Sequence, residues 1–258
     1  MSAAKSEDAT RISLSLTRLR CFAPDPPNGL PARARKASFD PHIVGKLMPV
    51  TVDYYMTLNS PWTYLGGALF AEIARRNGVS VNIKPSKFGP IFEQTGGLPL
   101  PKRSPQRRAY RLMDLKRWRE VRGIPLVLEP KYVPCDDLAA TRLLIAAKLQ
   151  GKDALKFSIE LGRALWEREE TLADPAAVAG AAQRAGLDAA QLRAGAPADA
   201  ELDALHDQFT KEAIDAGVFG APSFVLPSGE IFWGQDRLEL LERALKMQAS
   251  SPQMPPPS

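Results

Sequence analysis

The sequence is poor in the residues that redox and metal chemistry require. Its 258 residues include two cysteines, Cys21 and Cys135, and neither belongs to a Cys-x-x-Cys pair. This argues against a disulfide framework and a zinc site, and it favours a reducing, cytoplasmic setting. The two histidines, His42 and His206, leave little for a histidine triad or metal site, because those sites need imidazole. We predict no metal, and we interpret His206, in an acidic helical stretch, as a surface residue.

Long apolar runs are also missing. No stretch approaches the roughly 20 apolar residues that span a bilayer, so we predict no membrane segment. The hydrophobic share of 45% and the charged share of 24% are typical of a globular protein, and the length suits one core carrying an insertion. The net charge of +5 is compatible with nucleic acid, an anionic small molecule or no particular partner.

Both ends of the chain lack a stable hydrophobic pattern. Residues 1–47 mix Ser, Ala, Arg and Pro, and we predict a disordered N-terminal extension there. Its basic residues resemble those of a transit peptide, but Glu7 and Asp8 come early and no apolar segment follows. Translation from Met48 is the alternative. Residues 249–258 are predicted to be a disordered tail.

Residues 50–88 predict a β-α-β unit. A strand rich in β-branched and aromatic residues begins at Val50, and a helix follows at once. Ser60 is a good N-cap for this helix and Pro61 suits its first position. Residues 79–88 alternate as a second strand, which should run parallel to the first.

The rest of the chain predicts many helices and a final hairpin with a helix. Residues 89–210 are mostly helical in pattern, whereas residues 223–226 and 230–233 resemble short antiparallel strands joined by a turn. The last helix should begin at Asp236 as cap, with Glu239 three residues later. This β-α-β, helices, β-β-α order predicts an α/β thioredoxin-like fold at 48–248, formed by residues 50–88 and 211–247, with a large all-helical insertion at 89–210.

Ser60 stands where a dithiol enzyme of this fold carries its reactive cysteine. Such an enzyme needs two sulfurs one helical turn apart, and here the pair is Ser60 and Thr63, so dithiol exchange is excluded. A helix N-terminus favours an anion by about 0.3–2 kcal/mol, which would lower the pKa of a bound thiol from about 8.5 toward about 7. A hydrogen bond from the serine would stabilise the thiolate further. Alternatively, Ser60 is only an N-cap.

Two further segments favour a binding site beside Ser60. In a thioredoxin fold the proline before the third strand is cis, so Pro222 would leave the backbone of Ala221 free to pair with a bound peptide. A trans proline at a strand start is the alternative. In the segment FWGQDRL, backbone N–H groups suit a carboxylate while Asp236 suits an ammonium group.

Four segments in this order resemble those of 2-hydroxychromene-2-carboxylate isomerases and kappa-class glutathione transferases, within the DsbA-like group. They are TLNSPWTYLG, FGPIFEQTGG, RRAYRLMDLKRW with GIPL, and GVFGAPSFV with GEIFWGQDRLELLE. The resemblance covers about residues 50–247. It implies glutathione as cofactor, with its thiol near Ser60, its cysteinyl backbone at Ala221 and Pro222, and its γ-glutamyl end surrounded by Trp233, Gly234, Gln235 and Asp236. It also implies a homodimer.

The resemblance implies a reaction in which the thiolate adds to a conjugated carbonyl compound, so that a double bond becomes rotatable before elimination. Two departures concern the substrate. Gly96-Gly97 replaces a common Gly-Asn, and Phe92 stands nearest to a lysine that naphthalene-pathway isomerases use near the substrate carboxylate.

Other cations are available for an anionic aromatic substrate. Nine Lys or Arg residues lie between positions 102 and 122, against two acidic residues, and Lys102 and Arg107 are our weak candidates for substrate contacts. A solvated basic face is the alternative. Tyr132 is a weaker candidate for the substrate wall, with core packing as its alternative.

The leading hypothesis is thus a glutathione-dependent isomerase acting on a conjugated aromatic keto acid, as in aromatic compound catabolism. A kappa-like glutathione transferase or peroxidase uses the same thiolate. A DsbA-like binding module without its cysteines is a non-enzymatic alternative that predicts no glutathione affinity. Nucleic-acid binding rests only on a basic helix without interleaved aromatic residues, so we predict no nucleic-acid partner.

Overall fold

The computed structural model describes residues 50–250 of the chain. Contacts divide the chain into two units, Met1–Lys46 and Leu47–Ser258, and the described residues belong to the second unit. The predictions for residues 1–47, for Cys21 and His42, and for residues 251–258 of the predicted tail lie outside the described residues. Residues 249 and 250, also predicted to belong to the disordered tail, instead end the last helix.

The described strands form one mixed sheet of four strands in the order β2-β1-β3-β4. They are β1 (Thr51–Met56), β2 (Ser80–Pro85), β3 (Ser223–Val225) and β4 (Ile231–Trp233). Strands β1 and β2 are parallel, with Thr51 opposite Ser80, whereas β3 is antiparallel to both β1 and β4. The predicted β-α-β unit and the predicted hairpin are therefore confirmed.

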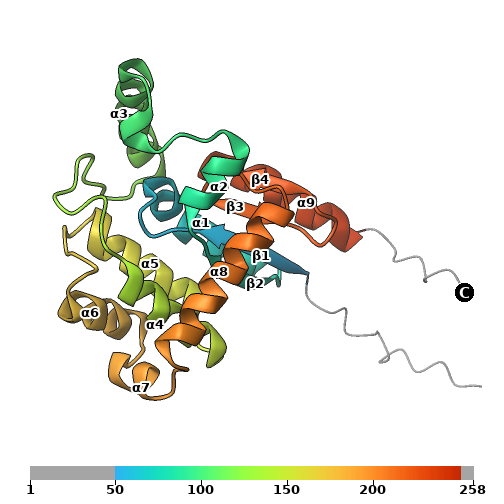
Figure 1. The fold of residues 1–258 in the computed structure, drawn as a ribbon. Coiled ribbons are helices and arrows are strands. Elements are labelled where there is room, and N and C mark those ends of the chain that lie inside the picture. Colours follow the sequence, from blue (N-terminus) through green and yellow to red (C-terminus); the bar gives the residue numbers. More distant parts are fainter. Residues whose placement is uncertain (1–49, 251–258) are drawn as a thin grey trace, which may run out of the picture. The chain divides into compact units, whose positions relative to one another are not determined.

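Helices account for most of the remaining described chain (Figure 1). Their bounds are α1 (Pro61–Arg76), α2 (Phe88–Thr95), the short η1 (Leu100–Lys102), α3 (Pro105–Arg122), α4 (Leu138–Leu149), α5 (Ala154–Trp166), α6 (Pro175–Ala185), α7 (Ala189–Ala194), α8 (Asp199–Asp215), the short η2 (Gln235–Arg237) and α9 (Leu238–Ser250). The predicted thioredoxin-like fold with a helical insertion is confirmed.

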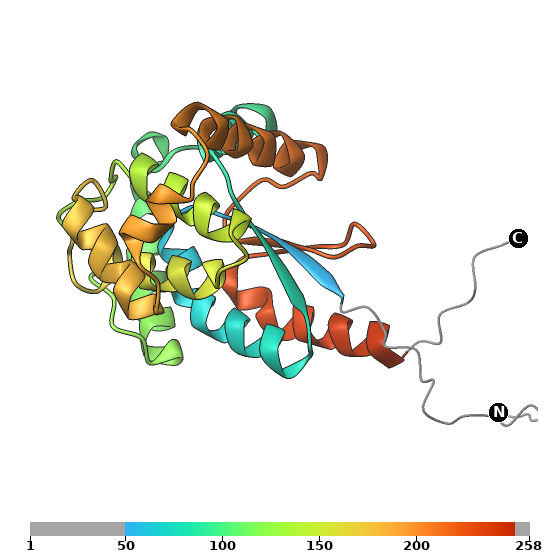
Figure 2. The same cartoon turned by 90° about the horizontal axis from the view of Figure 1, so that it is seen from below.

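Helices cover both faces of the sheet (Figure 2). Because successive side chains of a strand point to opposite faces, Tyr54 of β1 packs with the residues of α1 and α9 while Tyr55 packs with those of α2 and α8. Tyr54 stacks on Phe224 at a ring-centroid distance of 5.1 Å, and Phe70 of α1 approaches Phe224 to 4.5 Å. These three rings fix α1 on the sheet, and with it the position of Ser60.

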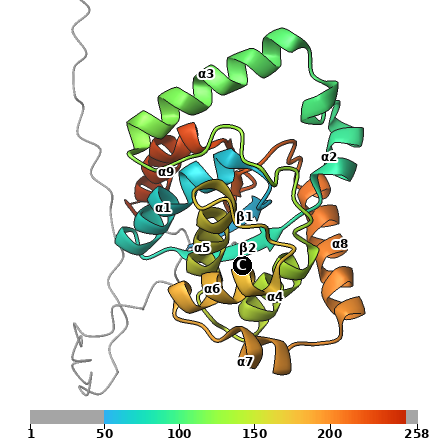
Figure 3. The ribbon, with the colours of Figure 1, turned by 90° about the vertical axis from the view of Figure 1, so that its left-hand side faces the viewer.

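The insertion and α8 are attached to this core by long-range contacts (Figure 3). Helix α5 packs on α1, and the indole Nε1 of Trp166 donates a hydrogen bond to the Leu58 carbonyl oxygen at 2.9 Å. The predicted insertion ends at residue 210, but α8 continues across this position to Asp215. Helix α8 packs against both β2 and α2. The loop that precedes Ser60 is thus held by the insertion.

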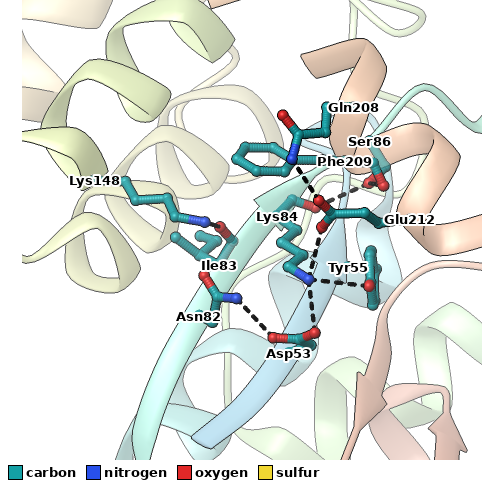
Figure 4. Close-up of polar contacts among 10 residues, drawn as sticks. All are labelled: Asp53, Tyr55, Asn82, Ile83, Lys84, Ser86, Lys148, Gln208, Phe209 and Glu212. Atoms are coloured by element: carbon teal, nitrogen blue, oxygen red, sulfur yellow. Dashed lines mark hydrogen bonds and ion pairs between the residues drawn. The ribbon is translucent and has the colours of Figure 1, made fainter. Parts of the chain in front are cut away.

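A buried lysine joins α8 to the sheet (Figure 4). The Lys84 ammonium lies 2.6 Å from Asp53, 2.8 Å from Glu212 and 3.2 Å from the Tyr55 hydroxyl. Burial alone would lower the pKa of Lys84, but its hydrogen bonds with these groups outweigh burial, and the pKa is raised. Lys148, which donates to the Ile83 carbonyl at 2.8 Å, has a pKa lowered to about 8 by burial and by the Lys84 charge.

Three local expectations differ from the structure. Strand β2 ends at Pro85 and α2 already begins at Phe88, because proline supplies no N–H for a further ladder bond. Asp236 does not cap α9, since η2 begins one residue earlier and the Asp236 carboxylate pairs with Arg237 at 2.6 Å. His206 is only 9% exposed, because it lies on the same face of α8 as the buried Leu202, so its interpretation as a surface residue is wrong.

Candidate active site

Helix α1 begins at Ser60 for local reasons. Ser60 has an extended backbone (φ −100°, ψ 117°), and its Oγ accepts a hydrogen bond from the backbone N–H of Thr63 at 3.3 Å. Pro61 occupies the first helical position, where the missing N–H costs nothing. Ser60 is therefore an N-cap, and because a hydroxyl is also a donor, its proton is still available to another acceptor.

The hydroxyl of Ser60 faces the loop that precedes β3. Its Oγ donates to the carbonyl oxygen of Ala221 at 3.4 Å, across 161 residues of sequence. The Ala221-Pro222 peptide bond is cis, as predicted. The carbonyl of Pro222 accepts from the N–H of Gly234 at 2.9 Å, so this loop is also tied to the end of β4. The structure thus brings Ser60, Ala221, Pro222 and Gly234 together.

A second loop contacts the residue that precedes Ser60, and no sequence motif predicts it. The side chain of Asn59 forms two hydrogen bonds with the backbone of Cys135, accepting from its N–H at 2.8 Å and donating to its carbonyl at 3.0 Å. The Val133-Pro134 peptide bond just before this contact is also cis. Pro134 is the one local signal of this loop, although nothing in the sequence connects it to Asn59.

An acidic side chain accompanies this second loop. Burial raises the pKa of Asp137 to about 6, and the neighbouring charge of Asp136 acts in the same direction. Hydrogen bonds from the Asp137 backbone and from Asn59 oppose the shift. A carboxyl group that titrates near neutral pH therefore lies beside the residue that precedes Ser60.

Two exposed aromatic side chains border the loop at Ala221. Trp233 is 50% exposed and its ring centroid lies 4.8 Å from that of Phe219. The indole rests directly on Gly220, because a Cβ built there would lie 2.3 Å from the Trp233 Nε1. Phe219 was not among the predicted site residues, although it stands only two positions before Ala221 in the GVFGAPSFV segment.

The 233–236 turn divides its side chains between the surface and the interior. Gly234 has φ +98°, and a Cβ there would lie 2.4 Å from Oδ1 of Asp236, so only glycine leaves room for that carboxylate. Asp236 is partly exposed, whereas Gln235 is only 1% exposed. The Asp236 side chain is thus partly open to solvent, whereas the Gln235 side chain is buried.

The three candidate substrate residues differ in their exposure. Lys102 is exposed in η1 and Arg107 is exposed in the first turn of α3, while Tyr132 is half-buried against the core. Tyr132 has the Lys131 ammonium 5.0 Å from its ring centre. Within residues 50–250, no hydrogen bond or ion pair joins these three side chains to Ser60.

The two departures from the resembled family form a single feature. A Cβ at Gly97 would lie 2.3 Å from the Phe92 ring, so the ring of Phe92 occupies the space that a side chain at position 97 would need. The phenyl ring at 92 and the glycine at 97 therefore depend on each other. The two polar residues expected from the resemblance, a lysine near position 92 and an asparagine at position 97, are both replaced within this one contact.

A comparison with protein families assigns the described domain to a known family. The family described as the DsbA-like thioredoxin domain matches residues 51–246. The chain belongs to the DsbA-like thioredoxin domain family. Within this DsbA-like domain, Ser60 begins the first helix and Ala221 precedes the cis proline.

Named relatives of this DsbA-like protein are enzymes. It is 28% identical over 209 residues to human glutathione S-transferase kappa 1, covering 77% of this chain and 92% of the relative. It is 28% identical over 199 residues to the 2-hydroxychromene-2-carboxylate isomerase of Sphingobium xenophagum, covering 77% and 99%. A solved structure of a 2-hydroxychromene-2-carboxylate isomerase superposes with a TM-score of 0.65 at 24% identity, covering 77% and 96%. The resemblance and the expectation of an enzyme are confirmed.

Neither a metal cluster nor a membrane-spanning helix occurs in the described part of the chain. Residues 50–250 contain no group of three or more His, Cys, Asp or Glu side chains placed to hold a metal ion. None of the helices described for these residues combines the length and the apolar character that crossing a bilayer requires.

Proposed function

We propose that this DsbA-like protein is a glutathione-dependent isomerase of the 2-hydroxychromene-2-carboxylate isomerase type. One observation carries the proposal: the Ser60 hydroxyl lies at the N-terminus of α1 and within 3.4 Å of the Ala221 carbonyl. A hydroxyl in this place can exchange its long bond to Ala221 for a shorter one to a thiolate bound alongside. Named relatives that are a glutathione transferase and an isomerase support the same assignment.

Ser60 and α1 would together stabilise a thiolate. The first N–H groups and the dipole of α1 favour negative charge at this end of the helix. Bound glutathione supplies the thiolate, which adds reversibly to a conjugated aromatic keto acid and so permits rotation about the former double bond. Ser60 stabilises the sulfur's charge and is not itself the nucleophile.

The remaining predicted residues would hold glutathione in register with Ser60. The backbone of the half-buried residue Ala221, before the cis Pro222, would pair with the cysteinyl unit. The Asp236 carboxylate would accept from the γ-glutamyl ammonium group, with Trp233 and Gly234 beside it. Exposed Lys102 and Arg107 would attract an anionic substrate, and Tyr132 remains a weak candidate for its wall.

The alternative is a kappa-like glutathione transferase or peroxidase. The packing of Phe92 on Gly97 favours it, because an apolar ring then stands nearest to the position where naphthalene-pathway isomerases use a lysine for the substrate carboxylate. An apolar electrophile would then be the better substrate. Assembly as a homodimer, a cytoplasmic location and participation in aromatic compound catabolism stay predictions.

Turnover with two substrates distinguishes these functions. The protein is incubated with glutathione and a hydroxychromene carboxylate, and separately with glutathione and a chlorodinitrobenzene. Isomerisation should change the absorbance of the first substrate while the total thiol stays constant, whereas conjugation consumes one thiol per turnover. No glutathione binding by calorimetry would reject both activities and favour the cysteine-less binding module.

A further inference from the structure

The last turn of α3 is anchored to the 233–236 turn by Arg122. Its guanidinium Nε donates to Oε1 of Gln235 at 2.8 Å, and its Nη2 donates to the backbone carbonyl of Gln235 at 2.8 Å. Its Nη1 contacts the Glu239 carboxylate at 3.2 Å, and its guanidinium carbon lies 4.9 Å from the centre of the Trp118 ring. The side chain is 10% exposed. Figure 3 shows this end of α3 beside α9.

Gln235 depends on this contact. Its Cβ packs against α1, where a Cβ added to Gly66 would lie only 2.8 Å away. Its Nε2 is buried and has no hydrogen-bond partner within the described residues. Arg122 therefore supplies the hydrogen bonds that fix this side chain, and both acceptors of Gln235 are occupied by a single guanidinium group.

Arginine is suited to this position in a way that lysine is not. A planar guanidinium can bind two acceptors at once in a fixed geometry, and it can stack on an indole ring, whereas an ammonium group is a single compact charge. The contact joins three elements: α3 of the insertion, the 233–236 turn, and α1, which begins at Ser60. It thereby couples the helical insertion to the predicted glutathione site.

We propose that Arg122 is a positioning residue for glutathione. It holds the 233–236 turn in the conformation in which Asp236 and the turn's backbone meet the γ-glutamyl end, without itself touching the ligand. Within the basic segment 102–122, Arg122 thus has a geometric role, whereas Lys102 and Arg107 are exposed. This inference rests on the proposed binding of glutathione.

The test compares two ligands that differ only in the γ-glutamyl unit. Calorimetry on the full chain measures the dissociation constants of glutathione and of cysteinylglycine. The wild-type protein is compared with three variants, Arg122→Met, Arg122→Lys and Arg119→Met. Arg119 is the matched control, because its Nη1 donates from the same helix to the Leu126 carbonyl at 3.2 Å. Arg122→Lys keeps the charge and provides a second variant if Arg122→Met does not fold.

Arg122→Met should weaken glutathione binding roughly tenfold, the equivalent of about 1.4 kcal/mol, while cysteinylglycine binding changes less than about twofold. Arg122→Lys should show a smaller loss of the same kind, with a raised KM for glutathione and unchanged kcat. Arg119→Met should leave both ligands unaffected. Equal losses for the two ligands, or no loss for either, would overturn the role of Arg122 alone. A wild-type protein that binds neither ligand would instead reject the proposed function, and this role with it.

Discussion

Single residues of the candidate site can combine a structural contact with a free donor group. Ser60 caps α1 through Thr63 and still offers its proton to Ala221, so the two interpretations of this residue are compatible. His206 shows the opposite case, because a residue in an acidic sequence stretch proves to be buried and structural. Its Nδ1 has no hydrogen-bond partner within the described chain. Local sequence identified the capping serine but not the burial of the histidine.

Because of His206, the free energy of unfolding should depend on pH in the acid range. Burial and the neighbouring Lys87 charge together lower its pKa to about 4, against the opposing effect of Asp207 and Asp203. Below pH 6.5 this histidine takes up a proton in the unfolded chain but not in the folded chain. The free energy of unfolding should therefore fall as the pH is lowered from 6.5 to 4, by at most about 3 kcal/mol. Urea unfolding across this range should show a smaller fall in His206→Gln. Identical pH profiles for the two proteins would contradict this assignment.

The secondary-structure elements show which contacts a sequence can reveal. The start of α1, the β-hairpin and the final helix follow from residues close together in the chain, such as Pro61 and Gly229. The contact of Asn59 with Cys135 spans 76 residues and that of Arg122 with Gln235 spans 113, and neither has a local pattern. Sequence therefore predicted the elements, but not the long-range contacts that hold the candidate site in place.

The close packing of α1 on the 233–236 turn can be tested by replacing two glycines with alanine, one at this contact and one away from it. Gly66→Ala would place a Cβ 2.8 Å from that of Gln235, so the turn must shift and the free energy of unfolding should fall by about 1–3 kcal/mol. Gly89→Ala, in α2, meets open space and should be neutral or stabilising by up to about 1 kcal/mol. Urea unfolding measures both. A Gly66→Ala protein as stable as the control would show that the turn yields without cost.

At the scale of the whole molecule, the chain keeps the framework of a thiol-dependent fold without its dithiol. The α1 N-terminus, the cis proline and the helical insertion are present, whereas Ser60 and Thr63 occupy the positions of the two cysteines. Cys135 lies beside Asn59, but its Sγ accepts from the N–H of Leu172 at 3.3 Å and is half-buried. On the proposed function, the reactive thiol would instead arrive with the ligand.

Dithiol exchange should be absent from this protein. In an insulin reduction assay with dithiothreitol, the wild-type chain should not accelerate precipitation, and Cys135→Ser should behave identically. Replacing both Ser60 and Thr63 by cysteine should create a pair one helical turn apart, detectable as a disulfide by thiol counting. Reduction of insulin by the wild-type protein would mean that another thiol of the chain is redox-active.

Thiolate activation by Ser60 is tested most directly by a pH titration of bound glutathione, followed by thiolate absorbance in the ultraviolet. In the wild-type protein the pKa of the bound thiol should lie near 7, below the free value of about 8.5, because the α1 N-terminus and the Ser60 hydroxyl both favour the anion. Ser60→Ala should raise this pKa while glutathione still binds, with Ser104→Ala, at the start of α3, as a capping-serine control. A Ser60→Ala protein that ionises the bound thiol as readily as the wild type would contradict the role assigned to Ser60.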